Sequence, residues 1–249
     1  MTVMRHGGNF LAFVELVSDR VTSFEPYPFS IPAIASLRNR LRFSPGATLF
    51  VGENGSGKST LIEAIAVAAG FNAEGGTSNF RFSTRSSESG LHRCIRLART
   101  ERRPRTGFFL RAESFFNVAT AIEELDQEPG GRRVIDSYGG RSLHEQSHGE
   151  SFMAVVEHRF GAGGLYILDE PEAALSVQRQ IELLRELHLH VVEKGSQLVV
   201  ATHSPVLMAL PGALIYQLGD EGITRIEYEQ TAAYRLTRDF LADRTKFLE

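Results

Sequence analysis

Short apolar runs alternate along the chain with longer segments in which apolar residues recur at helical spacing. Three of these runs are dominated by large or β-branched apolar residues: 48–51, 165–168 and 197–201. Runs of this kind are typical of strands buried on both faces of a parallel sheet. Residues 60–69 and 176–193 predict helices that stop at Gly70 and Gly195. The alternation predicts an α/β fold, a mostly parallel sheet flanked by helices.

Further elements are expected around this pattern. The other β-prone runs are residues 13–17, 92–100, 106–112, 213–218 and 223–228. Because only a short polar segment separates 92–100 from 106–112, these two runs predict a hairpin at the sheet periphery. Residues 213–218 and 223–228 predict a terminal hairpin in the same way. Helices are expected over residues 34–41, 114–125 and 151–160, and an exposed loop over residues 72–90.

Length and composition indicate one soluble domain that spans residues 1–249. The 249 residues carry a net charge of −3, which gives no general attraction to nucleic acid or to anionic membranes. Cys94 is the single cysteine, which suits a reducing compartment. No apolar run approaches the roughly 20 residues that cross a bilayer, and residues 1–10 lack the features of a secretory signal. We therefore expect a cytoplasmic protein.

The most specific motif is G-E-N-G-S-G-K-S, which spans residues 52–59 between a predicted strand and a predicted helix. It fits the pattern G-x-x-x-x-G-K-[ST], whose glycines let backbone N–H groups surround phosphates at a helix N-terminus. Lys58 is expected to reach the β- and γ-phosphates, and the Ser59 hydroxyl to bind Mg²⁺. The expected ATP contacts are Gly52, Asn54, Gly55, Ser56, Gly57, Lys58, Ser59 and Thr60. The alternative, a chance glycine-rich turn, does not account for the flanking strand and helix.

Polar residues also follow the two later buried strands. Asp169 and Glu170 end the run L-Y-I-L, where Asp169 is expected to bind Mg²⁺ and Glu170 to orient or deprotonate the attacking water. His203 follows the next strand and is expected to contact the γ-phosphate or that water. With Lys58, these residues form the predicted catalytic set. The alternative is a pair of strand ends with solvated polar side chains.

The order of the motifs resembles that of the ABC-type ATPase superfamily, and the resemblance covers most of the chain. Ser147, His148, Gly149 and Glu150 stand where that family has a signature sequence that opens a helix. The resemblance implies that this segment meets the γ-phosphate of ATP bound to a second copy, in an ATP-dependent head-to-tail homodimer. A helix N-cap at Ser147 is the simpler interpretation, and the two are compatible.

The resemblance also implies a division of the single ATPase domain. Residues 1–112 and 161–249 would form the nucleotide-binding core, with a peripheral antiparallel β portion, and residues 113–160 a small helical signature lobe.

The chain departs from the family pattern in two places. The family normally has a glutamine between the phosphate loop and the signature, but no glutamine occurs between Lys58 and Glu124. Glu113 is the candidate substitute, as a ligand of Mg²⁺ or water. An acidic residue that favours a helix N-terminus is the alternative. Ser176 stands where relatives often have aspartate, which weakens the case for signalling between subunits through this position.

Within the superfamily, the Gly-Glu-Asn-Gly opening and the Gly-Glu ending of the signature are similar to heads of SMC and RecF type. The segment between Glu113 and Ser147 is too short for a coiled-coil arm. The resemblance implies a small stand-alone bacterial ATPase that hydrolyses Mg-ATP in a DNA-maintenance or defence-type complex, with a separate effector protein. Two alternatives remain. One is the energising subunit of a membrane transporter, which would need a membrane partner and is not favoured. The other is an ATP-sensing module with little turnover.

One basic cluster stands out from the even distribution of charge. It comprises Arg93, Arg96, Arg99, Arg102, Arg103 and Arg105. Such a cluster could contact nucleic-acid phosphates. A solvated hairpin whose arginines pair with nearby acids is the favoured interpretation, because charge runs are usually solvated.

Overall fold

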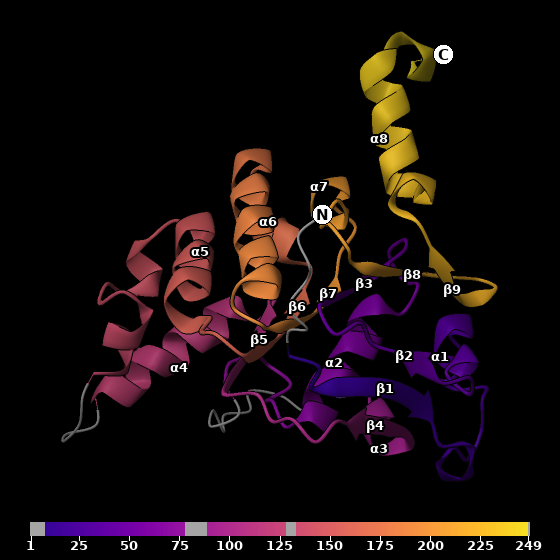
Figure 1. Cartoon of the computed structure of the whole chain (residues 1–249), viewed down its shortest axis with the longest axis horizontal. Helices are drawn as coiled ribbons and strands as arrows, with labels where there is room; N and C mark the ends of the chain where they lie inside the picture. Colours follow the sequence, from indigo (N-terminus) through magenta and orange to yellow (C-terminus); the bar gives the residue numbers. More distant parts are fainter. Residues whose placement is uncertain (1–7, 78–88, 128–132, 249) are drawn as a thin grey trace.

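Two β-sheets organise the protein, whose computed structural model describes residues 8–77, 89–127 and 133–248 (Figure 1). The smaller sheet is antiparallel, in the order β2 (Leu41–Arg42), β1 (Leu11–Leu16) and β4 (Ile95–Arg99). The larger sheet has the order β5 (Thr106–Arg111), β6 (Gly164–Asp169), β7 (Gln197–Ala201), β3 (Ala47–Val51), β8 (Leu214–Gly219) and β9 (Gly222–Ile226). In this spatial order the strands from β5 through β3 to β8 are mutually parallel, and only β9 is antiparallel to its neighbour. The predicted α/β fold with a mostly parallel sheet and an antiparallel β portion is confirmed.

Each face of the larger sheet packs into a separate hydrophobic cluster. Ile167 and Val199 point to the face that packs with α2 (Lys58–Ala69) and the smaller sheet. Leu168 and Val200, the next residues of the same strands, point to the opposite face. There they pack with α6 (Val177–Val192) and two further helices, α4 (Phe115–Gln127) and α5 (His148–Arg159). Because successive side chains of a strand alternate between faces, an unbroken apolar run is buried on both sides.

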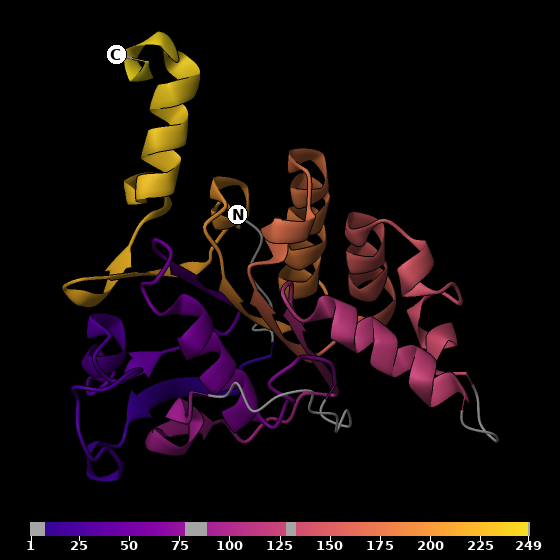
Figure 2. The ribbon, with the colours of Figure 1, turned by 180° about the vertical axis from the view of Figure 1, so that it is seen from behind.

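The remaining helices lie at the margins of this core. They are α1 (Pro32–Ser36), α3 (Leu91–Cys94), α7 (Pro205–Met208) and α8 (Ala232–Ala242). Short 3₁₀ segments are η1 (Ser18–Arg20), η2 (Val134–Tyr138), η3 (Leu143–Glu145), η4 (Pro171–Ala174), η5 (Tyr228–Gln230) and η6 (Thr245–Phe247). Helices α4 and α5 lie at one end of the molecule and the smaller sheet at the other (Figures 1 and 2). Helix α8 extends away from the body in both views and was not predicted from the sequence.

The predicted hairpin over residues 92–112 is wrong. Strand β4 pairs with β1 in the smaller sheet, whereas β5 pairs in parallel with β6 at the edge of the larger sheet. Phe108, Phe109 and Leu110 are consecutive and fully buried, which fits a strand enclosed on both faces rather than the outer arm of a hairpin. The polar segment between the two runs therefore crosses from one sheet to the other.

Other sequence-based boundaries need smaller corrections. The hairpin over residues 213–228 forms as β8 and β9, but it is not terminal, because α8 follows it. The α2 and α5 helices each begin a few residues earlier than the apolar pattern predicts, at Lys58 and His148. Much of the loop expected over residues 72–90 lies outside the described residues.

His190, on α6, lies in the core between α6 and the larger sheet. Its side chain is buried, and its ring packs edge-on against Phe160 and Tyr166 at centroid distances of 5.7 and 5.5 Å. Burial, with the nearby Lys194 ammonium, lowers the pKa of His190 to about 4.

Within the described chain, no helix is both long enough and apolar enough to span a membrane.

Gln197 connects the two sheets through its side chain. It lies at the start of β7 and is fully buried. Its Oε1 accepts hydrogen bonds from the backbone N–H groups of Phe10 and Leu11, both at 2.8 Å. Its Nε2 donates to the carbonyls of Leu11 and Ser44 at 3.0 and 2.8 Å. All four hydrogen-bonding positions of the amide are therefore used between elements distant in sequence.

We predict that Gln197→Met lowers the free energy of unfolding by at least about 3 kcal/mol. Methionine has a similar volume but leaves the backbone groups of residues 10, 11 and 44 without this partner, at about 1 to 3 kcal/mol for each buried unsatisfied group. Urea denaturation of the purified chain measures the change. Gln178→Met is the matched control, since Gln178 is exposed on α6 and its side chain bonds Glu182 alone among the described residues. An equal effect of the two substitutions would contradict the prediction.

Candidate functional site

Three adjacent parallel strands deliver the predicted site residues to one edge of the larger sheet. In the order β6, β7, β3, their carboxyl ends lead into residues 169–170, residues 202–204 and the phosphate loop. Backbone hydrogen bonds continue past the strand ends: Glu170 N–H donates to Ala201 O, and Thr202 N–H donates to Phe50 O, both at 3.0 Å. The three loops are thus held together by the same type of bond that holds the sheet.

The phosphate loop spans Gly52 to Gly57 and leads directly into α2. Gly57 is the N-cap of the helix with φ of 94°, a left-handed conformation that favours glycine. At Gly52, a Cβ atom would lie 2.5 Å from the carbonyl oxygen of Leu218, so a side chain does not fit there. The loop therefore turns where the motif places its glycines, with the N-terminus of a twelve-residue helix behind it.

Lys58 lies inside the turn of this loop. Its side chain is 3% exposed, and its Nζ donates to the carbonyls of Gly52 and Glu53, each at 2.9 Å. The Lys58 Nζ is also 3.9 Å from Glu170 Oε1. On the far side of the helix start, the Thr60 hydroxyl lies 3.0 Å from the Tyr27 hydroxyl. The ammonium of Lys58 is held in place for an anion in the loop.

Asp169 ends β6 and is 3% exposed. Burial raises the pKa of its carboxyl from 3.8 to about 7, although the Arg111 charge and a hydrogen bond from the Ser59 side chain act in the opposite direction. Asp169 Oδ1 is buried and has no hydrogen-bond partner among the described residues. An acceptor oxygen of this kind, beside the Ser59 hydroxyl, fits a cation at this position.

Mg²⁺ is compatible with this donor set. Among the described residues, no three His, Cys, Asp or Glu side chains are grouped so that they could hold a metal by themselves. Mg²⁺ bound with a nucleotide does not need such a group, because phosphates and water complete its shell. Asp169 and Ser59 are therefore the residues that would hold it.

Arg111 is a site residue that the sequence reasoning missed. It ends β5 directly beside Asp169, and its Nε lies 3.5 Å from Asp169 Oδ2. Its other guanidinium nitrogens contact Glu63 Oε2 at 2.8 Å and Glu113 Oε2 at 3.1 Å. Glu113, the predicted metal or water ligand, is 84% exposed and held by Arg111. The signal in the sequence was an arginine that ends a β-prone run, but only the strand order places it beside Asp169.

Glu170 has a left-handed backbone conformation, with φ of 48° and ψ of 51°. It is the one described residue other than glycine with a positive φ. Its Oε1 lies 3.9 Å from both Lys58 Nζ and His203 Nδ1. The conformation costs about 1 to 2 kcal/mol, and the Glu170–Ala201 hydrogen bond helps to maintain it. The structure thus brings the predicted catalytic set, Lys58, Glu170 and His203, into one cluster.

A second missed residue, Glu172, lies two positions beyond this cluster. Its carboxylate is buried, and its Oε1 accepts from the Thr202 hydroxyl at 2.7 Å and from His203 N–H at 2.6 Å. In the sequence it follows Glu170 by two residues, and no motif indicates that it faces the next loop.

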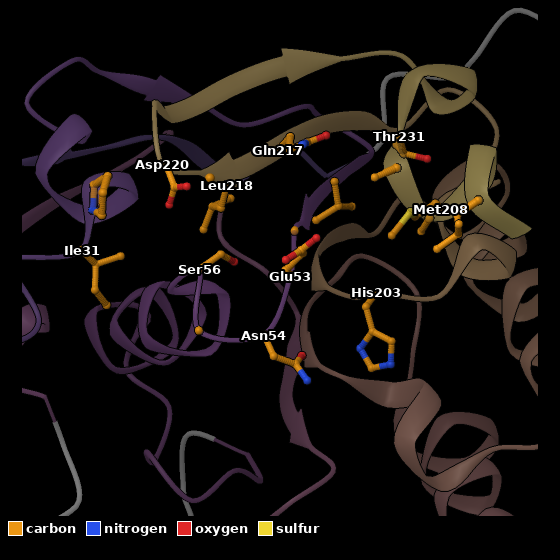
Figure 3. A pocket seen from close by; sticks show the side chains of 18 residues that line it. Ile31, Glu53, Asn54, Ser56, His203, Met208, Gln217, Leu218, Asp220 and Thr231 are labelled. Atoms are coloured by element: carbon orange, nitrogen blue, oxygen red, sulfur yellow. The ribbon is translucent and has the colours of Figure 1, made fainter. Parts of the chain in front are cut away.

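A cavity of about 600 Å³ extends over the phosphate loop. Figure 3 shows Glu53, Asn54 and Ser56 on one side of it and His203 on another, with Met208 and Leu218 among the apolar side chains that line it. Leu236, near the start of α8, also contributes to the lining. The space is large enough for a nucleotide and has the mixed polar and apolar lining typical of ligand sites.

The predicted signature residues lie elsewhere. Ser147 is the N-cap of α5 and forms a reciprocal capping box with Glu150: its hydroxyl accepts from Glu150 N–H at 3.4 Å, and Glu150 Oε2 accepts from Ser147 N–H at 3.0 Å. None of Ser147, His148, Gly149 and Glu150 is among the described residues that line the cavity. The helix cap is observed, and contact with a nucleotide of a second copy stays a prediction.

The six arginines of the basic cluster are divided by the fold. Arg96 pairs with Glu15, and Arg99 donates to the carbonyls of Ala68 and Ala69 at the end of α2. Arg102, Arg103 and Arg105 are exposed on the crossing between the sheets, with no carboxylate paired to them among the described residues. Arg93 is also exposed. Among the described residues, Arg96 is the one member of the cluster that pairs with an acid, as the favoured interpretation expects.

Comparisons with known proteins agree with this geometry. Residues 30–137 match a family model described as "AAA domain". Residues 116–209 match one described as "AAA domain, putative AbiEii toxin, Type IV TA system". Two overlapping segments of the chain are thus similar to AAA domains, which supports a P-loop NTPase. The phosphate loop and the Asp169–Glu170 strand end both lie inside the matched segments.

Several solved structures align with the chain at low sequence identity. A "putative metal-chelate type ABC transporter" in an inward-facing conformation aligns with 15% identity and a TM-score of 0.51, over 92% of this NTPase and 88% of that chain. The protein cbiO1 from Clostridium perfringens, part of an ABC transporter complex, aligns with 14% identity over 84% of this chain and 88% of that one, with a TM-score of 0.48.

An SMC head domain from Thermotoga maritima aligns with 18% identity over 76% of this chain and 92% of that one, with a TM-score of 0.41. No curated protein matches the NTPase in sequence.

We predict that Arg111→Met lowers the free energy of unfolding by about 2 to 3 kcal/mol, because it removes the guanidinium shared by three carboxylates at a partly buried position. Denaturant unfolding gives the value. Arg179→Met is the control: Arg179 is 41% exposed and, within the described part of the chain, forms an ion pair with Glu182, so its loss should cost less than about 1 kcal/mol. If Glu63→Gln does not offset part of the Arg111→Met effect in a double-mutant cycle, the charge explanation is wrong.

Proposed function

We propose that this NTPase binds Mg-ATP in the cavity over the phosphate loop and hydrolyses the β–γ phosphoanhydride bond. The observation that supports this most strongly is the cluster of Lys58, Glu170 and His203, which three different strands bring together at the mouth of the loop. The phosphate loop by itself supports binding. The carboxylate beside it adds a group that can accept a proton from water.

In the proposed reaction, Lys58 exchanges its two loop carbonyls for oxygens of the β- and γ-phosphates, which an ammonium binds more strongly. Glu170 orients the attacking water and accepts its proton. The water oxygen bonds to the γ-phosphorus as the bond to the bridging oxygen breaks, and the electron pair leaves with ADP. His203 accepts a hydrogen bond from the second proton of that water through Nε2. Mg²⁺, held by Asp169 and Ser59, supplies positive charge to the phosphate oxygens when bound.

We further propose that ATP joins two copies head to tail, so that Ser147 and its neighbours approach the γ-phosphate bound to the partner. What supports this is their separation from the cavity within one chain, together with their place at the N-terminus of a helix. Glu150 would then have to release the N-cap to admit a phosphate, because both are anionic. The resulting switch would act on an effector protein in a defence-type or DNA-maintenance complex; the description of the family model that matches residues 116–209 favours defence.

We predict that Lys58→Ala weakens binding of Mg-ATP at least about 100-fold, since it removes a charge-assisted contact to two phosphates. Titration with a fluorescent ATP analogue measures the affinity. Lys246→Ala, at an exposed position near the C-terminus, is the matched control and should bind as the wild type does. Unchanged affinity of Lys58→Ala, in a protein that melts like the wild type, would contradict the assignment of the phosphate loop.

We predict that Glu170→Gln lowers ATP turnover about 100- to 1000-fold without weakening ATP binding, since glutamine keeps the shape but cannot accept the proton. Phosphate release measures turnover, and Glu221→Gln, exposed in the β8–β9 turn, serves as control. In ATP the trapped variant should also run as a dimer in light scattering. Wild-type turnover in Glu170→Gln would refute the role of Glu170. Binding without turnover in the wild type would instead indicate an ATP-sensing module.

A further inference from the structure

The loop that carries His203 is held by one buried carboxylate from the neighbouring strand end. Glu172, in η4, is 6% exposed, and its Oε1 faces the loop after β7. That oxygen accepts from the Thr202 hydroxyl at 2.7 Å, from His203 N–H at 2.6 Å and from Ser204 N–H at 3.1 Å. The imidazole Nδ1 of His203 lies 3.2 Å from the same oxygen. Three hydrogen bonds from three consecutive residues thus converge on one atom, and the imidazole nitrogen of His203 lies beside it.

Glu172 has no lysine or arginine partner within the described part of the chain. Burial of a carboxylate is costly unless hydrogen bonds or charges compensate for it. Here the compensation comes from the loop alone, through backbone N–H groups, one hydroxyl and one imidazole. The position of the carboxylate and the conformation of residues 202–204 therefore depend on each other.

The contact with the His203 side chain differs from the three hydrogen bonds, because it involves an imidazole ring, in which either of two distinct nitrogens can carry the proton. His203 Nδ1 lies between two carboxylates, 3.2 Å from Glu172 Oε1 and 3.9 Å from Glu170 Oε1. A proton on Nδ1 would face the nearer oxygen, that of Glu172. Nε2 is then the nitrogen left to the cavity, where the half-exposed ring lies near Asn54 of the phosphate loop (Figure 3).

We propose that Glu172 is a positioning residue that fixes the tautomer and the orientation of His203, so that Nε2 faces the phosphate site. A base or donor whose ring is oriented by a third, buried carboxylate is a general arrangement in hydrolytic sites. The effect on turnover rests on the proposed ATPase function, whereas the effect on the tautomer does not. Glu172 itself touches no nucleotide in this scheme.

Two substitutions separate positioning of the ring from support of the loop. Glu172→Gln keeps the size of the side chain and an acceptor oxygen for the backbone N–H groups, but removes the charge that faces Nδ1. Thr202→Val removes one loop contact of Glu172 and leaves its contact with the ring. Glu157→Gln, exposed on α5, controls for the loss of one surface charge. Melting temperatures establish that each variant is folded.

The test is long-range ¹H–¹⁵N NMR of the histidine rings in the full chain, with the His203 signals assigned by their loss in His203→Asn. We expect His203 of the wild type to be mainly the Nδ1–H tautomer. Glu172→Gln should shift it toward Nε2–H, while Thr202→Val and Glu157→Gln should leave it unchanged. An Nε2–H tautomer in the wild type overturns the proposal without any variant. An unchanged tautomer in Glu172→Gln, or an equal shift in Thr202→Val, overturns it as well.

Steady-state kinetics give the second measurement. In Glu172→Gln, kcat for ATP should fall about 10- to 100-fold, as expected for loss of one aligned hydrogen bond to a charged group. KM should change less than about twofold, because Lys58 and the loop still bind the phosphates. A rise in KM with unchanged kcat overturns the positioning role. If the wild type shows no turnover but the NMR results are as expected, the ATPase proposal fails and the assignment of Glu172 stands.

Discussion

The parallel pairing of β6, β7 and β3 is the constraint on which the site depends. The pairing brings three carboxyl ends to one edge, and the backbone bonds Glu170–Ala201 and Thr202–Phe50 extend it into the loops. The phosphate loop, the acidic pair and the His203 loop are consequently fixed relative to one another by main-chain geometry. Side-chain contacts of 3 to 4 Å between them follow from this arrangement. A crevice at the carboxyl ends of parallel strands is a general place for ligands in α/β folds.

Charge is arranged around this edge in two groups. Lys58 lies inside the phosphate loop, next to Glu170, and its ammonium is bound by carbonyls that can release it to phosphates. Arg111 ends β5, the edge strand next to β6, and contacts Glu63, Glu113 and Asp169. The first cation is placed to bind an anion. The second is shared among carboxylates, so that Asp169 can stay beside Ser59 in a buried position.

Much of the site could be predicted from the sequence because its parts are local. The phosphate loop needs glycines at fixed spacing before a helix, and Asp169, Glu170 and His203 each follow a recognisable buried strand directly. These features involve only residues close in the chain. Arg111 and Glu172 could not be found in this way. Each contacts a residue that an adjacent strand brings close, and neither belongs to a sequence motif that indicates this contact.

By itself, the sequence determined the α/β class, the three buried strands, the α2 helix after the phosphate loop and the terminal glycine of that helix. Local conformational preference and hydrophobic period suffice for such features. Only the tertiary structure decided that β4 and β5 join different sheets, that His190 is buried against Tyr166, and that α8 extends from the body next to the cavity. These outcomes depend on which apolar surfaces meet, and that is a property of the whole chain rather than of any segment.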